Sequence, residues 1–280
     1  MRLGLIGQGA VALQALGAMS REIKVPIEML VALARAGSAG KARDALAPFQ
    51  GKLAHNVEIV SDVEALVAAR PVLIAEAASH EAVQLYGPAI LESGIDFLVT
   101  SAGALAFREA RAALDAAAAR GKCRWHILAG AIGGLELLSA ARLSGLIEVL
   151  YTSRNPPSAW RGTPAEKLVD LDAIAESITF YEGSADGAAR EYPQNANVAA
   201  TIALVGAGFD RTRVRLADPA ATRNVHEITI RSSCADVEIR IAGAPSPHNP
   251  KTSLTTGFAL AVRLLEVTRG EMHYIMKRVP

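Results

Sequence analysis

The chain has 280 residues, a length that fits one large domain or two ordinary ones. It is 51% hydrophobic and 5% aromatic, and its formal net charge of +1 gives no reason to expect nucleic acid or an anionic membrane surface as a partner. No run of about 18 apolar residues occurs, so we expect no transmembrane helix. Cys123 and Cys234 lie far apart without metal-ligand spacing, so we predict a reduced, cytoplasmic protein without a metal site.

The first half of the chain alternates strand-like and helix-like segments. The predicted strands are Leu3–Ile6, Glu28–Ala34, Val57–Ile59, Val72–Glu76, Phe97–Thr100 and Arg124–Leu128. The predicted helices are Val11–Met19, Lys41–Ala47, Asp62–Ala69, His80–Ser93 and Phe107–Arg120. This βαβα order is typical of a parallel sheet covered by helices on both faces. Asp62 is predicted to be a helix N-cap, and Gly94 and Gly121 are predicted to follow helix ends.

The pattern changes after Leu128. The predicted strands of the second half are Glu148–Ser153, Ser177–Tyr181, Arg213–Leu216, Val225–Arg231 and Ala235–Ile241, and the predicted helices are Leu135–Arg142, Asn195–Gly206 and Ser253–Val267. The last three strands alternate apolar and polar residues, which indicates a half-exposed antiparallel sheet. We therefore predict an α/β protein with two domains, a parallel-sheet domain over residues 1–129 completed by a C-terminal helix over 252–268, and an α+β domain over 130–251.

A glycine turn joins the first predicted strand to the first predicted helix, in the sequence Gly7-Gln8-Gly9-Ala10-Val11-Ala12. Gly7 permits the tight turn, Gly9 leaves space where a pyrophosphate approaches the backbone, and Ala12 is small enough for helix–strand packing. The phosphates would lie at the positive end of the helix. We therefore predict a Rossmann-type dinucleotide-binding domain with cofactor contacts from the five residues Gly7, Gln8, Gly9, Ala10 and Val11. The alternative is an ordinary βα turn without a ligand.

The end of the second predicted strand bears on the choice of cofactor. In NAD-specific domains an acidic residue about twenty positions after the turn binds the ribose 2′-hydroxyl. Arg35 occupies that place here, and an arginine there pairs with the 2′-phosphate of NADP. We predict NADP or NAD as the cofactor, with NADP accepted through Arg35. The alternative is that Arg35 is a solvated loop residue.

Several polar segments of the second half have a distinctive order. They are Gly130-Ala131-Ile132-Gly133-Gly134, Tyr181-Glu182-Gly183-Ser184-Ala185, Tyr192-Pro193-Gln194-Asn195-Ala196-Asn197, Ala217-Asp218-Pro219, Arg223-Asn224-Val225-His226-Glu227-Ile228 and Asn249-Pro250-Lys251-Thr252-Ser253. Together with the N-terminal turn, these segments resemble the L-aspartate dehydrogenase family. The resemblance implies a Rossmann-type domain and an α+β domain like those of homoserine dehydrogenase and dihydrodipicolinate reductase. It also implies reversible NAD(P)-dependent oxidation of L-aspartate to iminoaspartate, which hydrolyses to oxaloacetate and ammonia or feeds NAD biosynthesis.

The resemblance also assigns individual residues. The catalytic histidine of the family corresponds to His226, and its cofactor contacts correspond to Ala131 and Asn197. Two departures are visible, because Val11-Ala12 stands where the family commonly has Ile-Gly, and Arg35 stands where many relatives carry an acid.

The residue types fit this chemistry. The substrate amino group must be neutral before hydride leaves Cα, and a histidine with an ordinary pKa of about 6.5 is a suitable proton acceptor. His226 is also suited to activating the water that hydrolyses the imine. His80, at a predicted helix start, and His248, in a proline-rich loop, are rival candidates, whereas His126 in an apolar strand is expected to be a core residue.

The substrate carboxylates require hydrogen-bond donors. Lys251, Thr252 and Ser253 stand at a predicted helix start, where backbone N–H groups favour an anion, and Asn195 is assigned to the substrate with them. The alternative is that Thr252 or Ser253 is an ordinary helix cap.

Two other functions remain open at this point. One is an NAD(P)-dependent oxidoreductase of a related small amino acid, imino acid or semialdehyde, since the fold alone does not fix the substrate. The other is a non-catalytic NADP-binding sensor. The alternating sheet has an open face, so we also predict that the second domain forms a homodimer.

Overall fold

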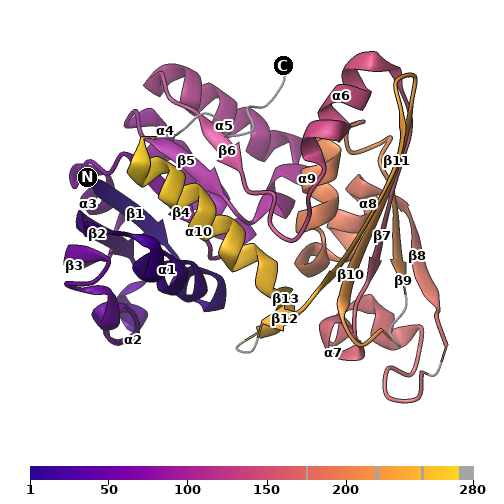
Figure 1. Cartoon of the computed structure of the whole chain (residues 1–280), viewed down its shortest axis with the longest axis horizontal. Helices are drawn as coiled ribbons and strands as arrows, with labels where there is room; N and C mark the ends of the chain where they lie inside the picture. Colours follow the sequence, from indigo (N-terminus) through magenta and orange to yellow (C-terminus); the bar gives the residue numbers. More distant parts are fainter. Residues whose placement is uncertain (175, 218–220, 247–248, 271–280) are drawn as a thin grey trace. The chain divides into compact units, whose positions relative to one another are not determined.

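A computed structural model describes residues 1–174, 176–217, 221–246 and 249–270. These residues form two compact units (Figure 1). The first unit contains residues 1–128 and the C-terminal segment from residue 257, and the second unit contains residues 129–256. Within the described residues, no helix combines the length and the apolar character needed to cross a membrane.

The first unit is built on a six-stranded parallel sheet with the order β3-β2-β1-β4-β5-β6. The strands are β1 (Arg2–Ile6), β2 (Ile27–Leu33), β3 (Ala54–Val60), β4 (Leu73–Glu76), β5 (Asp96–Val99) and β6 (Trp125–Ile127). This is the Rossmann strand order, whose direction of winding reverses between β1 and β4. The predicted fold class is confirmed, and each observed strand overlaps the strand predicted from the sequence.

Six helices connect or follow the strands of this sheet in the chain. They are α1 (Ala10–Glu22), α2 (Ala39–Leu46), α3 (Val63–Ala68), α4 (His80–Glu92), α5 (Arg108–Gly121) and α10 (Leu254–Arg269), with short 3-10 turns η1 (Ala36–Ser38), η2 (Ala47–Phe49) and η3 (Ala102–Ala106). The prediction that Asp62 is an N-cap is confirmed for α3. Its Oδ1 accepts a hydrogen bond from the backbone N–H of Ala65 at 2.7 Å.

The prediction that Gly121 follows the end of α5 was wrong. The helix includes Gly121, and Lys122 takes the left-handed conformation with φ of 56°. A Cβ at position 121 would lie 1.8 Å from the carbonyl oxygen of Leu91 in α4. This glycine is therefore explained by the close approach of two helices rather than by a turn.

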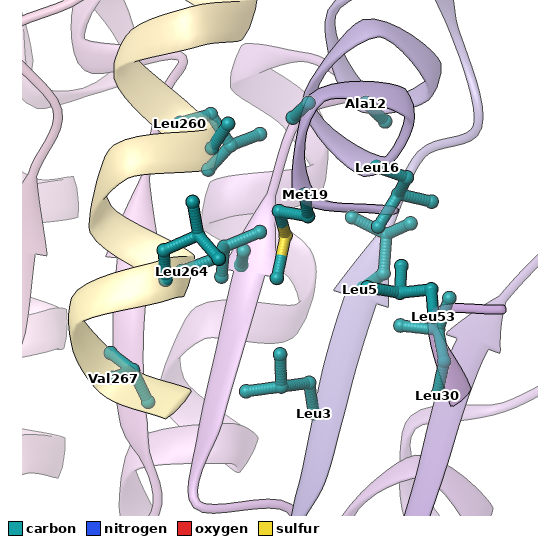
Figure 2. Close-up of a cluster of buried hydrophobic side chains, with 14 of the residues drawn as sticks. Leu3, Leu5, Ala12, Leu16, Met19, Leu30, Leu53, Leu260, Leu264 and Val267 are labelled. Carbon is teal, nitrogen blue, oxygen red and sulfur yellow. The ribbon is translucent and has the colours of Figure 1, made fainter. Parts of the chain in front are cut away.

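The core of the first unit joins the two ends of the chain. Figure 2 shows Leu260, Leu264 and Val267 of α10 in the same buried cluster as Leu3 of β1 and Met19 of α1. All five side chains are almost fully buried. Burial of a leucine or methionine side chain contributes about 2 kcal/mol, so α10 is an integral part of this unit.

The second unit contains a five-stranded sheet with the order β11-β10-β7-β9-β8. Its strands are β7 (Leu146–Arg154), β8 (Thr179–Ser184), β9 (Arg213–Ala217), β10 (Asn224–Ser232) and β11 (Asp236–Gly243), and a separate pair is formed by β12 (Pro245–Ser246) and β13 (Asn249–Ser253). Its helices are α6 (Leu135–Gly145), α7 (Pro157–Trp160), α8 (Ala185–Glu191) and α9 (Asn197–Val205), with 3-10 turns η4 (Pro164–Lys167) and η5 (Pro193–Asn195).

The sheet of the second unit is mixed rather than antiparallel. β10 pairs antiparallel with β11, as the alternation predicted, and also with β7, whereas β9 pairs antiparallel with β8 but parallel with β7. The antiparallel prediction was therefore wrong for the β7–β9 pair. Alternation of apolar and polar residues reports that one face is exposed, and it carries no information about strand direction.

Candidate active site

The glycine turn after β1 has the geometry that its sequence predicts. Gly7 has φ of 92°, a conformation that favours glycine. A Cβ at this position would lie 2.5 Å from the carbonyl oxygen of Ala77 and 2.8 Å from the Cβ of Ala78. Any side chain at position 7 would therefore collide with the segment that follows β4.

Gly9 serves a different purpose from Gly7. It is the N-cap residue of α1 with φ of −84°, and a Cβ built on it would meet nothing within 4 Å. Among the described residues, no side chain caps α1, and its first turn contains no acidic residue. The first N–H groups of this 13-residue helix are therefore available to an anion. This open, uncapped turn fits the pyrophosphate of a dinucleotide.

Gln8 fixes the turn beside the end of β2. Its side-chain Nε2 donates a hydrogen bond to the carbonyl oxygen of Leu33 at 2.9 Å. Arg35 follows two residues later and is exposed. In the described part of the chain its guanidinium makes no hydrogen bond or ion pair, so it is available to a ligand. The side chain of Gln8 is thus structural, whereas Arg35 has the freedom that a contact with the adenosine ribose requires.

Glu76 is a buried acid that the sequence analysis did not single out. It is the last residue of β4 and has no exposed surface. Its carboxylate accepts hydrogen bonds from the backbone N–H groups of Ala78, Thr100 and Ser101 and from the Ser101 hydroxyl, at 2.6 to 3.2 Å. The signal was an acidic residue at the end of an otherwise apolar strand. This side chain holds together the segments that follow β4 and β5.

His226 lies inside the second unit with one ring nitrogen engaged. It is in β10, is 6% exposed, and its Nδ1 lies 2.8 Å from the hydroxyl oxygen of Tyr151 in β7. The two rings are stacked, with an angle of 21° between their planes. Nε2 has no hydrogen-bond partner among the described residues. Tyr151 therefore fixes the orientation of the imidazole through Nδ1 and leaves the Nε2 position unengaged in the described part of the chain.

Burial changes the acid–base properties of this pair. It lowers the pKa of His226 from 6.5 to about 4, because the charged imidazolium loses its solvation. It also raises the pKa of Tyr151 far above its usual range, so the phenol stays neutral. The ordinary histidine pKa assumed from the sequence is therefore corrected, and the imidazole of His226 is neutral throughout the neutral pH range.

Buried polar groups lie next to this pair. Ser153 of β7 is the residue opposite His226 in the strand pairing, and its hydroxyl oxygen accepts a hydrogen bond from the amide of Asn155, just after β7, at 2.8 Å. Ser153 and Asn155 are 2% and 6% exposed. His226 is therefore surrounded by buried polar groups as well as by Tyr151.

The rival histidines have other environments. His80 is the first residue of α4, in the first unit, and is partly buried. His126 is 4% exposed, with its Nε2 at 3.4 Å from an Asp96 carboxylate oxygen and its Nδ1 buried without a partner. His248 lies outside the described residues. His226 alone among the described histidines combines burial with a hydrogen bond to a neutral tyrosine hydroxyl.

The remaining residues that the sequence predicts to contact the cofactor lie in the second unit. Ala131 is 6% exposed in the loop before α6, and Asn197 is the first residue of α9. Asn195 lies in η5, and its Oδ1 is buried without a hydrogen-bond partner among the described residues. An unpaired buried amide oxygen is costly, so this atom is a candidate for contact with a ligand.

The expectation that residues 251–253 begin a helix was wrong in detail. They belong to strand β13, and α10 begins at Leu254. The Ser253 hydroxyl oxygen accepts a hydrogen bond from the backbone N–H of Thr255 at 3.4 Å, so Ser253 has the capping role that was the alternative to substrate binding. The side chains of Lys251 and Thr252 lie outside the described residues. No group of three metal-ligating side chains is found in the described part of the chain.

Comparison with known proteins decides the family. The chain is 40% identical over 261 residues to an L-aspartate dehydrogenase of Ralstonia pickettii, which covers 93% of this chain and 95% of the relative. The chain belongs to the L-aspartate dehydrogenase family. An L-aspartate dehydrogenase of Cupriavidus necator is 48% identical over 192 residues, covering 68% of this chain and 72% of the relative. The resemblance stated from the sequence is therefore confirmed.

Two family models match consecutive parts of this L-aspartate dehydrogenase homologue, and the second match includes the part of α10 that packs in the first unit. Residues 3–128 match the homoserine dehydrogenase NAD binding domain, and residues 136–267 match the aspartate dehydrogenase C-terminal domain. The crystal structure of aspartate dehydrogenase from Thermotoga maritima has the same fold, with a TM-score of 0.68 at 23% identity over 99% of this chain and 98% of that chain. A dehydrogenase of Thermus thermophilus solved with NAD and UDP-GlcNAcA gives a TM-score of 0.54 at 15% identity, over 97% of this chain and 89% of that chain. The protein is an oxidoreductase with a Rossmann-type domain.

Proposed function

We propose that the protein catalyses the reversible NAD(P)-dependent oxidative deamination of L-aspartate to iminoaspartate. The iminoaspartate then hydrolyses to oxaloacetate and ammonia or enters NAD biosynthesis. The observation that carries this proposal is the 40% identity to an L-aspartate dehydrogenase over 93% of the chain, since it extends across both units. A related substrate and a non-catalytic sensor are not favoured by any observation on the molecule.

Cofactor binding and substrate binding are assigned to different units. Residues 1–129, completed by α10, form the cofactor domain, and residues 130–253 bind the substrate and form the dimer contact. The cofactor contacts are Gly7, Gln8, Gly9, Ala10, Val11, Arg35, Ala131 and Asn197. When bound, the NAD(P) nicotinamide accepts the hydride from Cα of the substrate. The uncapped N-terminus of α1 favours its pyrophosphate.

His226 is the proposed catalytic residue. When Nδ1 carries the ring hydrogen and donates it to the Tyr151 oxygen, Nε2 has a free lone pair for a proton. A group with a pKa of about 4 is neutral at working pH but holds an accepted proton only briefly. This property suits the removal of a proton from water as it attacks the imine.

Substrate binding is assigned to Asn195, Lys251, Thr252 and Ser253. The unpaired Asn195 Oδ1 is a hydrogen-bond acceptor, which suits the amino group of aspartate. The Ser253 hydroxyl already caps its own turn, so the carboxylate contacts rest on Lys251 and Thr252.

Turnover of L-aspartate tests this function directly. The appearance of reduced nicotinamide is followed by its near-ultraviolet absorbance with L-aspartate, D-aspartate, L-glutamate or L-homoserine and either NADP or NAD. We expect reduction with L-aspartate, lost in His226→Ala while cofactor binding persists. His55→Ala, which changes an exposed histidine of β3, is the matched control. No turnover with L-aspartate, nor with oxaloacetate and ammonia in reverse, would contradict the proposal.

The cofactor preference depends on Arg35. Its exposed guanidinium can pair with the 2′-phosphate of NADP, and an aspartate there would instead accept a hydrogen bond from the 2′-hydroxyl of NAD. We expect Arg35→Asp to lower the ratio of kcat/KM for NADP to that for NAD at least tenfold. An unchanged ratio would remove Arg35 from the cofactor site.

The assembly and location are also proposed. We infer a cytoplasmic homodimer formed by the second unit, whose sheet has an exposed face that carries ion pairs between neighbouring strands, including Arg213 with Glu182 and Arg240 with the partly exposed Glu227. Light scattering gives the mass in solution, and a monomer mass would exclude the dimer.

A further inference from the structure

Glu76 has a charge that the proposed catalysis does not use. Oε1 of its carboxylate accepts from the Ala78 N–H at 2.6 Å and the Ser101 hydroxyl at 2.8 Å. Oε2 accepts from the Ser101 N–H at 3.0 Å and the Thr100 N–H at 3.2 Å. Both oxygens are thus saturated by donors, although the side chain has no exposed surface.

This donor set indicates an ionised carboxylate. Three of the four donors are backbone N–H groups, which cannot accept a proton in return. A hydrogen on either oxygen of Glu76 would displace one of these bonds. Burial raises the pKa of Glu76, and the same four hydrogen bonds lower it without cancelling the rise, so the case for the ionised form is the donor geometry. Among the described residues no cation pairs with it, so the negative charge is balanced by dipoles alone.

The position of Glu76 relates this charge to the cofactor. β4 is the strand next to β1 on the far side of the reversal in strand order. The residue after it, Ala77, donates its N–H to the Ile6 carbonyl oxygen at 2.8 Å, and its carbonyl oxygen lies beside Gly7. In Rossmann domains the dinucleotide crosses this point, with the adenosine ribose at the end of β2. The nicotinamide half therefore belongs on the side of β4 and β5, where Glu76 lies.

We propose that the buried charge of Glu76 makes the cofactor site bind the oxidised nicotinamide in preference to the reduced one. The oxidised ring carries a positive charge that the reduced ring lacks, whereas the rest of the dinucleotide is unchanged. A fixed negative charge behind the site therefore stabilises only the oxidised form. Two unit charges roughly 10 Å apart, at an effective dielectric constant of about 20, change a binding constant by about tenfold.

This preference has a consequence for the reaction. Tighter binding of the oxidised form makes the bound cofactor a weaker oxidant, by the reciprocity of linked equilibria. The equilibrium on the enzyme shifts toward the amino acid, whereas the affinity for the reduced cofactor is unchanged. The inference rests on the NAD(P) binding within the proposed function, and it is independent of which amino acid is the substrate.

The test measures dissociation constants for NADP⁺ and NADPH separately by calorimetry, without substrate. We expect Glu76→Gln to raise the ratio of the dissociation constant of NADP⁺ to that of NADPH about tenfold. Glu81→Gln is the matched control, because Glu81 is an exposed carboxylate in the first turn of α4, and it should leave the ratio unchanged. Equal losses for both forms in Glu76→Gln would mean a purely structural role and overturn the inference.

Ser101→Ala provides a second route if Glu76→Gln does not fold. It removes the donor at 2.8 Å that helps to hold Glu76 ionised, so the buried carboxylate is more readily protonated and its charge is weakened. We expect the same ratio to rise about twofold, and an unchanged ratio would again overturn the inference. A wild-type protein that binds neither NADP⁺ nor NADPH would refute the cofactor site itself. If the wild type binds both, and the ratio of their dissociation constants is the same in the variants, only the role of Glu76 is refuted.

Discussion

The burial of His226 should make the folded protein sensitive to acid. Its pKa is 6.5 when solvated and about 4 in the fold, so the unfolded chain binds the extra proton between these values. Stability from this residue is therefore complete above pH of about 6.5 and is lost as the pH falls toward about 4. The difference of about 2.5 pK units corresponds to about 3 kcal/mol, of which about 2 kcal/mol is lost by pH of about 5.

Urea unfolding of the wild type and of His226→Asn at pH of about 7 and about 5 measures this term. The asparagine does not titrate, so the stability of the wild type should fall by about 2 kcal/mol more than that of the variant. His55→Asn, at an exposed position, should follow the wild type. Equal losses in wild type and His226→Asn, or an NMR titration of the His226 ring near its solvated pKa, would refute the burial argument.

Three further changes test other parts of the structure. Gly9→Ala places a Cβ in open space, so the free energy of unfolding should change by less than about 1 kcal/mol. Calorimetry should show cofactor affinity reduced at least tenfold, because the Cβ enters the space of the pyrophosphate. Unchanged affinity would place the pyrophosphate elsewhere. Gly121→Ala forces a Cβ onto the Leu91 carbonyl oxygen and should cost about 3 kcal/mol in urea unfolding, which an unaltered midpoint would contradict. Tyr151→Phe removes the 2.8 Å hydrogen bond to His226 and should lower kcat about tenfold to hundredfold without changing KM for the cofactor. A kcat equal to that of the wild type would show that this bond does not orient the imidazole.

Local chemistry made much of the first unit predictable. Strands buried on both faces appear in the sequence as short apolar runs. The turn requires glycine at position 7, where φ is 92°, and at position 9, where a ligand must approach the backbone. Asp62 was identifiable as a cap because its carboxylate satisfies a helix N–H three residues later. These signals depend only on neighbouring residues, and they do not require knowledge of the tertiary fold.

The features that the sequence did not reveal depend on distant partners. Glu76 is stabilised by donors 24 and 25 residues away as well as by Ala78, and such partners leave no periodic pattern. Tyr151 and His226 are 75 residues apart and meet through the register of β7 and β10. The pKa of His226 could not be predicted either, because β10 alternates in sequence and only the packed helices determine how deeply its inner face is buried.

The place of α10 in the first unit has a consequence for biosynthesis. Leu260, Leu264 and Val267 complete a core that starts at Leu3, yet they are made only after the whole second unit has been synthesised. The nascent first unit therefore leaves the ribosome with part of its apolar surface uncovered. Unlike a chain whose domains fold in the order in which they are translated, this one closes its first unit last, and premature termination before α10 would leave that surface open to aggregation.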